Sequence, residues 1–121
     1  MTAFNIQQVR IARPTDQLDK ITHFYCKGLG FDRIMLSLPD TEYHLEFTHE
    51  HGPIVGRAPT RENLIVFYIP EMEQCQTVIN RLISFGYQPI QSHNPYCNKN
   101  GVTFEDPDGY IVIIQNDAWQ P

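Results

Sequence analysis

The pattern of apolar and polar residues is most informative near the C-terminus, in residues 101–115. Val102 and Phe104 alternate with polar neighbours, which predicts a strand with one solvated face. The next four residues, Asp-Pro-Asp-Gly at 106–109, predict a turn, because Pro presets φ, Asp side chains accept backbone N–H groups and Gly tolerates positive φ. Positions 110–114 are apolar throughout, which predicts a strand covered on both faces.

Two earlier segments place apolar residues three and four positions apart, which is typical of helices with one buried stripe. The first helix is expected to end near Lys27, with Thr15 or Asp16 capping its start. The second is expected over 71–85. The predicted inner residues are Leu18, Ile21, Phe24 and Tyr25 in the first helix, and Met72, Cys75, Ile79 and Leu82 in the second. The other predicted strands are 9–12, 31–38, 43–48, 64–69 and a short edge strand at 87–91.

The order of these elements repeats, which indicates a duplication. Pro14 and Pro70, like Gly30 and Gly86, lie 56 residues apart, whereas later equivalent positions lie 67 apart. The first half is therefore about eleven residues shorter. Either it lacks one edge strand, or a segment is absent from the sequence.

Composition narrows the possible functions. A chain of 121 residues predicts one domain, divided here into a first module over about 5–52, a connector over 53–61 and a second module over about 62–117. The net charge of −5 and the lack of a basic run argue against nucleic acids and anionic membranes as partners. No apolar run is long enough for a membrane span, and the polar N-terminus does not resemble a signal peptide. Three scattered cysteines without a Cys-x-x-Cys pair favour a cytoplasmic location.

The duplicated unit resembles the vicinal-oxygen-chelate superfamily, which contains glyoxalase I, fosfomycin and bleomycin resistance proteins and extradiol dioxygenases. The resemblance covers nearly the whole chain and is strongest at 10–16, 24–25, 28–31, 43–48 and 104–110. The chain is most similar to a bacterial glyoxalase-like branch without an assigned activity. The resemblance implies an α+β fold in which two tandem βαβββ modules form a curved mixed sheet around a pocket with the helices outside, often in a homodimer.

Metal-dependent members of this superfamily place one ligand on the first strand and one on the last strand of each half. By this resemblance, the last strand of the first half offers Glu46. The remaining positions fall within 6–8 (Ile, Gln or Gln), on Asn63 or Leu64, and on Ile113. One carboxylate with amides and aliphatic residues is a poor donor set for a hard divalent ion. We therefore expect the fold without the four-ligand metal site, and no cofactor is assigned.

The strand at 43–48 carries the main candidate chemistry. His44, Glu46 and Thr48 share one face, opposite Tyr43, Leu45 and Phe47. If the apolar face packs on the helix, the polar face would look into the pocket together with Gln8 and Arg10. Glu46 would then be a general base or an anchor for a ligand, and Arg10 would bind a carboxylate or phosphate. The alternative is a structural ion pair between Arg10 and Glu46.

Other residues have two interpretations each. His49 and His51, near His44 and Glu46, either form a makeshift metal site or are solvated loop residues. Tyr96 could stack on a planar ligand at the pocket mouth or cap the core. Further predicted ligand-binding residues are Asn63 and Phe67, and Phe67 could equally belong to the core.

The sequence therefore favours a protein that binds a small, partly apolar molecule between its two half-sheets. One alternative is a metal-dependent lyase or dioxygenase that uses Glu46 and nearby histidines, with a divalent metal on Glu46 and His44. Another is a non-catalytic dimerisation or partner-binding module.

Overall fold

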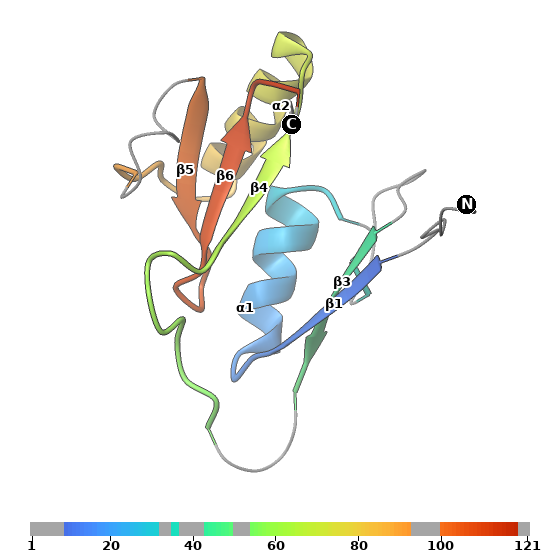
Figure 1. The fold of residues 1–121 in the computed structure, drawn as a ribbon, viewed down its shortest axis with the longest axis vertical. Helices are drawn as coiled ribbons and strands as arrows, with labels where there is room; N and C mark the ends of the chain where they lie inside the picture. The colour runs from blue at the N-terminus through green and yellow to red at the C-terminus, as the bar shows by residue number, and fades with distance from the viewer. Residues whose placement is uncertain (1–8, 32–34, 37–42, 50–53, 93–99, 119–121) are drawn as a thin grey trace, which may run out of the picture.

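The computed structural model describes residues 9–31, 35–36, 43–49, 54–92 and 100–118. Along the chain (Figure 1), the first half contains β1 (Val9–Pro14), α1 (Leu18–Thr22), the π-helix η1 (His23–Gly28), β2 (Met35–Leu36) and β3 (Tyr43–Thr48). The second half contains β4 (Leu64–Tyr68), α2 (Met72–Ser84), β5 (Gly101–Glu105) and β6 (Ile111–Gln115). No helix in this part of the chain is long and apolar enough to cross a membrane.

The two halves have the same topology. The described strands form two three-stranded sheets, ordered β1-β3-β2 and β4-β6-β5. In each sheet the first strand runs parallel to the last strand of its module, and the middle strand of the module pairs antiparallel with that last strand. The expected α+β class with two tandem modules is confirmed, although the two sheets are not closed into one. The predicted edge strand at 87–91 is reduced to a single bridge between Ile90 and Thr103.

The predicted hairpin at the C-terminus is confirmed. Every residue of β6 is buried, as its continuous apolar run predicts. The Oδ1 atom of Asp106 accepts the backbone N–H groups of Asp108 and Tyr110, at 2.8 and 3.1 Å. Gly109 has a φ of +88°, the conformation that favours glycine at the end of this turn.

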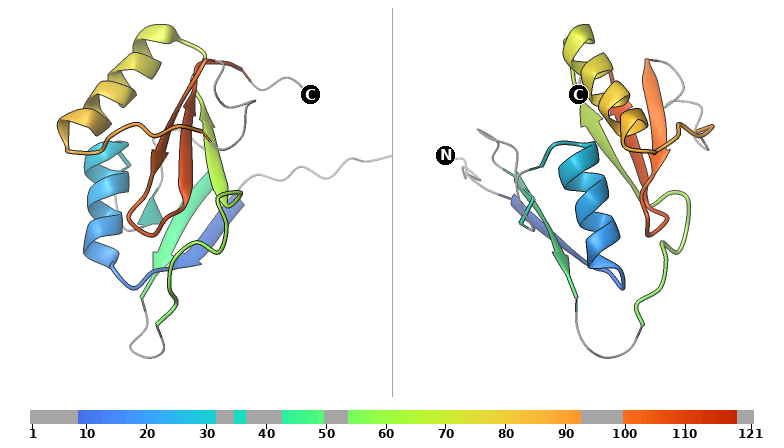
Figure 2. Two further views of the ribbon diagram at one scale, coloured as in Figure 1. Left: turned by 90° about the vertical axis from the view of Figure 1, so that its left-hand side faces the viewer. Right: turned by 180° about the vertical axis from the view of Figure 1, so that it is seen from behind.

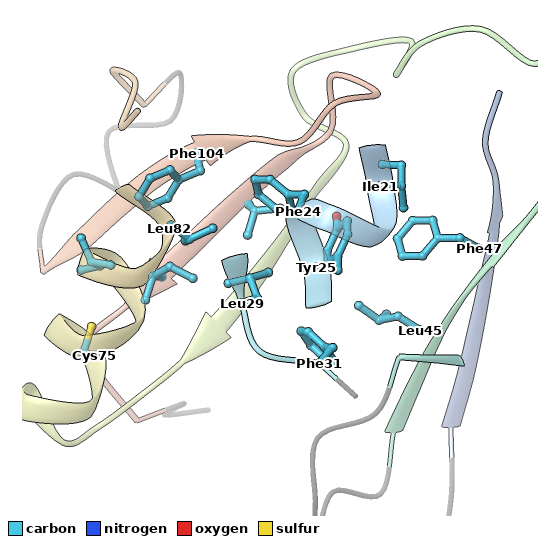
Figure 3. Close-up of a cluster of buried hydrophobic side chains, with 13 residues drawn as sticks. Ile21, Phe24, Tyr25, Leu29, Phe31, Leu45, Phe47, Cys75, Leu82 and Phe104 are labelled. Carbon is cyan, nitrogen blue, oxygen red and sulfur yellow. The ribbon is translucent and has the colours of Figure 1, made fainter. Parts of the chain in front are cut away.

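The first helical segment lies between the two sheets in the front and rear views, and both helices lie on the same side of the strands in the side view (Figures 1 and 2). The first helical segment must therefore bury side chains on more than one of its faces. Tyr25 points to Phe47 of the first sheet, with ring centroids 4.8 Å apart (Figure 3). The ring centroids of Phe24 and Tyr87 are 4.7 Å apart. Ile21, Phe24 and Tyr25 are completely buried, so the predicted apolar stripe is confirmed.

Neither of the predicted residues, Thr15 or Asp16, caps this helix, because its N-cap residue is Gln17 and no side chain makes a capping hydrogen bond. The Oγ1 atom of Thr15 accepts the N–H of Gln17 at 3.1 Å, whereas Asp16 accepts the N–H groups of Val55 and Gly56. These two hydrogen bonds lower the pKa of Asp16 and hold the connector against the β1–α1 turn. Asp16 therefore joins the connector to the first module instead of capping its helix.

Helix α2 buries Cys75, Ile79 and Leu82, as predicted. Met72 is 73% exposed, so its assignment to the inner face is wrong. Met72 is the first helical residue and precedes the turns that reach the core. Gly30 and Gly86 follow the two helical segments with φ of +87° and +97°, as expected for glycines that end helices.

The strand register refines the internal repeat. Pro14 pairs with Thr48, and Gln115, which lies 67 residues after Thr48, pairs with Tyr68. Pro14 is therefore equivalent to Tyr68 and not to Pro70. The spacing between equivalent residues changes after the first strand of each module because the helices differ in length. Helix α2 has 13 residues, whereas α1 has 5 and η1 has 6. The predicted strand at 31–38 contributes β2, and the other positions after Phe31 lie outside the described residues.

Candidate functional site

An apolar groove of about 750 Å³ lies between the first sheet and the β4 edge of the second. Its walls are formed by Ile11, Tyr43, Leu45, the segment 64–69, Val78 and Ile114. Leu29 and Phe31, which follow η1, complete the lining together with Gln74 of α2. Among the described lining residues, only Tyr43, Tyr68 and Gln74 have a polar group on the side chain, and none is charged.

The groove follows from strand periodicity and from the position of the first helix. On β3, Leu45 and Phe47 face the helix and are buried, and Tyr43 shares this face. On β1, Ile11 lies on the same side as Arg13, which contacts Tyr25 of η1. Because the helical segment separates the two sheets, the space that it does not fill becomes the groove. Strand β4 is apolar at every position, so both the face and the edge of this strand add apolar surface.

The predicted polar residues lie on the opposite face of the first sheet. His44, Glu46 and Thr48 alternate with the buried residues of β3 and do not line the groove. Arg10 and Glu46 form an ion pair, with Nε and Oε2 at 3.3 Å. The prediction that Arg10, His44 and Glu46 line the space between the two half-sheets is wrong for this groove, because none of the three is among its lining residues. The apolar face of β3 packs against the first helical segment and also lines the groove, so the polar face of β3 points away from the groove.

Of the other predicted site residues that the structure describes, only some line the groove. Phe67 lines it, as predicted. Asn63 lies directly before β4, where its Oδ1 atom accepts a hydrogen bond from the hydroxyl of Thr60 at 2.7 Å. The Nδ1 atom of His49 lies 3.0 Å from the backbone oxygen of Thr15, a residue of the β1–α1 turn. Gln8, His51 and Tyr96 lie outside the described residues.

The described residues do not fit the four-ligand metal site that the superfamily implies. Ile113 is buried and has no donor atom, and Leu64 is an apolar residue of the groove. Glu46 is already paired with Arg10. In the part of the chain that the structure describes, no group of three or more His, Cys, Asp or Glu residues could hold a metal ion.

A buried polar cluster that the sequence did not reveal joins the two modules. We call Arg13, Tyr25 and Asp106 the inter-module latch. The Oδ2 atom of Asp106 accepts hydrogen bonds from Arg13 at 2.5 Å and from the Tyr25 hydroxyl at 2.7 Å. The guanidinium of Arg13 also lies 3.6 Å from the ring centroid of Tyr110. The latch therefore ties β1 and η1 of the first module to the Asp-Pro-Asp-Gly turn of the second.

The surroundings of the inter-module latch raise the pKa of both Tyr25 and Arg13, so both groups keep their protons. Burial, and then the charge of Asp106, raises the pKa of Tyr25 well above its ordinary value, so the phenol stays protonated and donates to the carboxylate. Burial alone would lower the pKa of Arg13, but the electrostatic effects of Tyr25 and Asp106 outweigh it and raise that pKa. The Nε2 group of Gln17 adds hydrogen bonds to the Pro107 oxygen and to Asp108, at 2.6 and 2.8 Å. Arg13 and Asp106 are 93 residues apart, so no local pattern identifies the pair.

Comparison with known proteins connects this geometry to one family. The model described as YycE-like C-terminal domain matches residues 62–116, and the YycE-like N-terminal domain matches residues 9–35. YycE of Bacillus subtilis (strain 168) is 40% identical over 127 aligned positions, covering 95% of this chain and 91% of YycE. A 2.0 Å crystal structure of the YycE protein from B. subtilis has a TM-score of 0.86 at 39% identity, covering 99% of this chain and 96% of that chain.

Two more distant structures share the fold alone. TnmS3, an antibiotic-binding protein from Streptomyces sp. CB03234, has a TM-score of 0.58 at 16% identity and covers 93% of this chain and 95% of its own. The trypanothione-dependent glyoxalase I of Leishmania major has a TM-score of 0.63 at 14% identity, with coverages of 95% and 88%.

Proposed function

The chain belongs to the YycE-like family of proteins with the glyoxalase and bleomycin-resistance fold, and on this premise we propose that it binds a small, partly apolar molecule in the groove between its two modules. The groove carries this proposal. Its volume of about 750 Å³ falls within the range typical of ligand pockets, and such pockets are mostly apolar with few polar groups. TnmS3, which shares the fold, is described as binding an antibiotic, and this supports a small-molecule role for the scaffold.

The proposed binding does not use the superfamily's four-ligand metal site. Ile113 cannot coordinate a metal, and the carboxylate of Glu46 faces Arg10 on the outer surface of the first sheet. A catalytic or anchoring role for Glu46 and Arg10 remains a prediction, as does the lyase or dioxygenase alternative. The groove is the better-supported site because residues of both modules line it.

Filling the groove should abolish binding. Ile11→Trp places an indole on a groove residue that is 55% exposed, so the ring can enter the groove without disrupting the core. We expect it to weaken binding of the neutral fluorescent probe N-phenyl-1-naphthylamine at least about tenfold, which corresponds to ~1.4 kcal/mol. A fluorescence titration measures this directly.

Val9→Trp is the matched control. Val9 is 46% exposed and lies two residues before Ile11 on the same face of β1, but it does not line the groove. This variant should bind the probe with an affinity within about twofold of the unaltered protein, a difference of under ~0.5 kcal/mol. Equal probe affinity in both Trp variants would contradict the assignment of the groove as the binding site.

We also propose that the protein acts as a cytoplasmic homodimer. Strands β1 and β4 are edge strands of the two described sheets, and exposed apolar side chains such as Ile11 and Tyr68 lie along them. Apolar edge strands are usually covered by another segment or chain. Light scattering should give twice the mass of the 14.1 kDa chain, and a monomer at high protein concentration would refute the dimer.

A further inference from the structure

We propose that the ligand of the groove is an uncharged molecule with a planar aromatic body and a hydrogen-bond acceptor, such as a carbonyl oxygen, that receives the hydroxyl proton of Tyr43. This inference rests on the proposed function and specifies the chemical class that the same groove would select. Three features of the groove support it: its uncharged lining, its aromatic rings and a tyrosine hydroxyl that has no hydrogen-bond partner among the described protein groups.

The lining of the groove disfavours charged ligands. None of the described residues that line the groove is charged, so an ionised ligand would lose its hydration without gaining a counterion. The start of α2 adds negative charge near this end of the groove in sequence, because Glu71 and Glu73 both precede the groove residue Gln74. The net charge of the chain, −5, acts in the same direction. The groove should therefore prefer the neutral member of any pair of otherwise similar ligands.

Aromatic rings from both modules line the groove. Phe31, which follows η1, and Phe67 of β4 have ring centroids 5.7 Å apart with an interplanar angle of 57°. Tyr43 and Tyr68 add two more rings, from β3 and β4. Aromatic groups favour offset-stacked and edge-to-face partners over aliphatic ones of equal area. A planar aromatic ligand can contact rings of both modules at once.

The hydroxyl of Tyr43 supplies the directional contact. Tyr43 is half-buried, and burial raises the pKa of its phenol, so the group remains a protonated donor. Within the described part of the chain, this hydroxyl makes no hydrogen bond with any protein group. Tyr68 differs, because it already has an interaction partner. Partly buried tyrosine hydroxyls usually find a hydrogen-bond partner, and a ligand acceptor would provide one for Tyr43.

Two matched pairs of probes test the inference. N-phenyl-1-naphthylamine and 1-anilinonaphthalene-8-sulfonate share the same aromatic body, but only the second is an anion. The neutral probe should bind at least about tenfold more tightly, a difference of ~1.4 kcal/mol. Fluorenone and fluorene are both planar, and only fluorenone has a carbonyl acceptor. Fluorenone should bind about two- to tenfold more tightly, as expected for one hydrogen bond.

Tyr43→Phe should remove the preference for fluorenone and leave fluorene binding unchanged. Tyr68→Phe is the control, since it removes a hydroxyl from the same groove and should keep the preference. Equal affinity for the neutral and anionic probes, or an intact fluorenone preference in Tyr43→Phe, would overturn the inference while leaving the groove a binding site. Failure of all four probes to bind would instead overturn the proposed function, and the inference with it.

Discussion

Asp106→Asn is expected to lower the free energy of unfolding by about 3–5 kcal/mol, the usual cost of removing one partner of a buried ion pair. Asn keeps the oxygen that accepts the N–H groups of Asp108 and Tyr110, so the turn itself should survive. It loses the negative charge that faces Arg13 at 2.5 Å. The guanidinium would then remain largely buried without a counterion. Urea unfolding followed by far-UV circular dichroism measures the loss.

Glu105→Gln is the matched control for this prediction. It makes the same change of charge at the neighbouring residue, where Glu105 pairs with Arg57 at 2.9 Å and both side chains are exposed. Exposed pairs contribute about 0–1 kcal/mol, so this variant should be close to the unaltered protein. Similar losses in the two variants would show that the inter-module latch does not stabilise the fold.

Phe24→Ala should also cost about 3–5 kcal/mol, because it leaves a cavity where two modules meet. Phe24 is completely buried beside Tyr25 (Figure 3). It lies edge-on to Tyr25 and to Tyr87, with ring centroids 4.9 and 4.7 Å away. Tyr87 follows α2 of the second module, so the cavity would weaken contacts in both halves. We expect one cooperative unfolding transition at a lower urea concentration.

The control is Phe85→Ala, which removes the same ring from a residue that is 41% exposed. Its expected cost is about 1 kcal/mol, since less apolar surface returns to water. If Phe24→Ala produced two separate transitions, the modules would be independent folding units, contrary to the shared core described above.

Local chemistry was sufficient to predict the elements whose residues interact with near neighbours. The continuous apolar run of β6 and the Asp106–Gly109 turn depend on contacts within a few residues, and both were predicted correctly. The alternation of Leu45 and Phe47 with Glu46 also gave the correct two faces of β3. These predictions require only the period of a strand and the conformational preferences of Pro, Asp and Gly.

The site was harder to predict because it depends on how the modules pack. Alternation shows that Glu46 and Leu45 face opposite ways, but it does not show which face borders the groove. That was decided by the position of the first helix between the sheets, which places Leu45 on the groove side. The π-helix was also not predicted, and its hydrogen bond from Leu29 N–H to the Phe24 oxygen spans one residue more than an α-helical bond.

The central claim is that the ligand enters the apolar groove and not the polar outer face of the first sheet. Methyl and amide NMR spectra recorded during titration with N-phenyl-1-naphthylamine test this claim most directly. We predict that the largest shifts occur at groove residues, represented by Ile11, Leu45 and Val78. Shifts concentrated instead at the amides of His44 and Glu46, with the groove methyls unchanged, would contradict it.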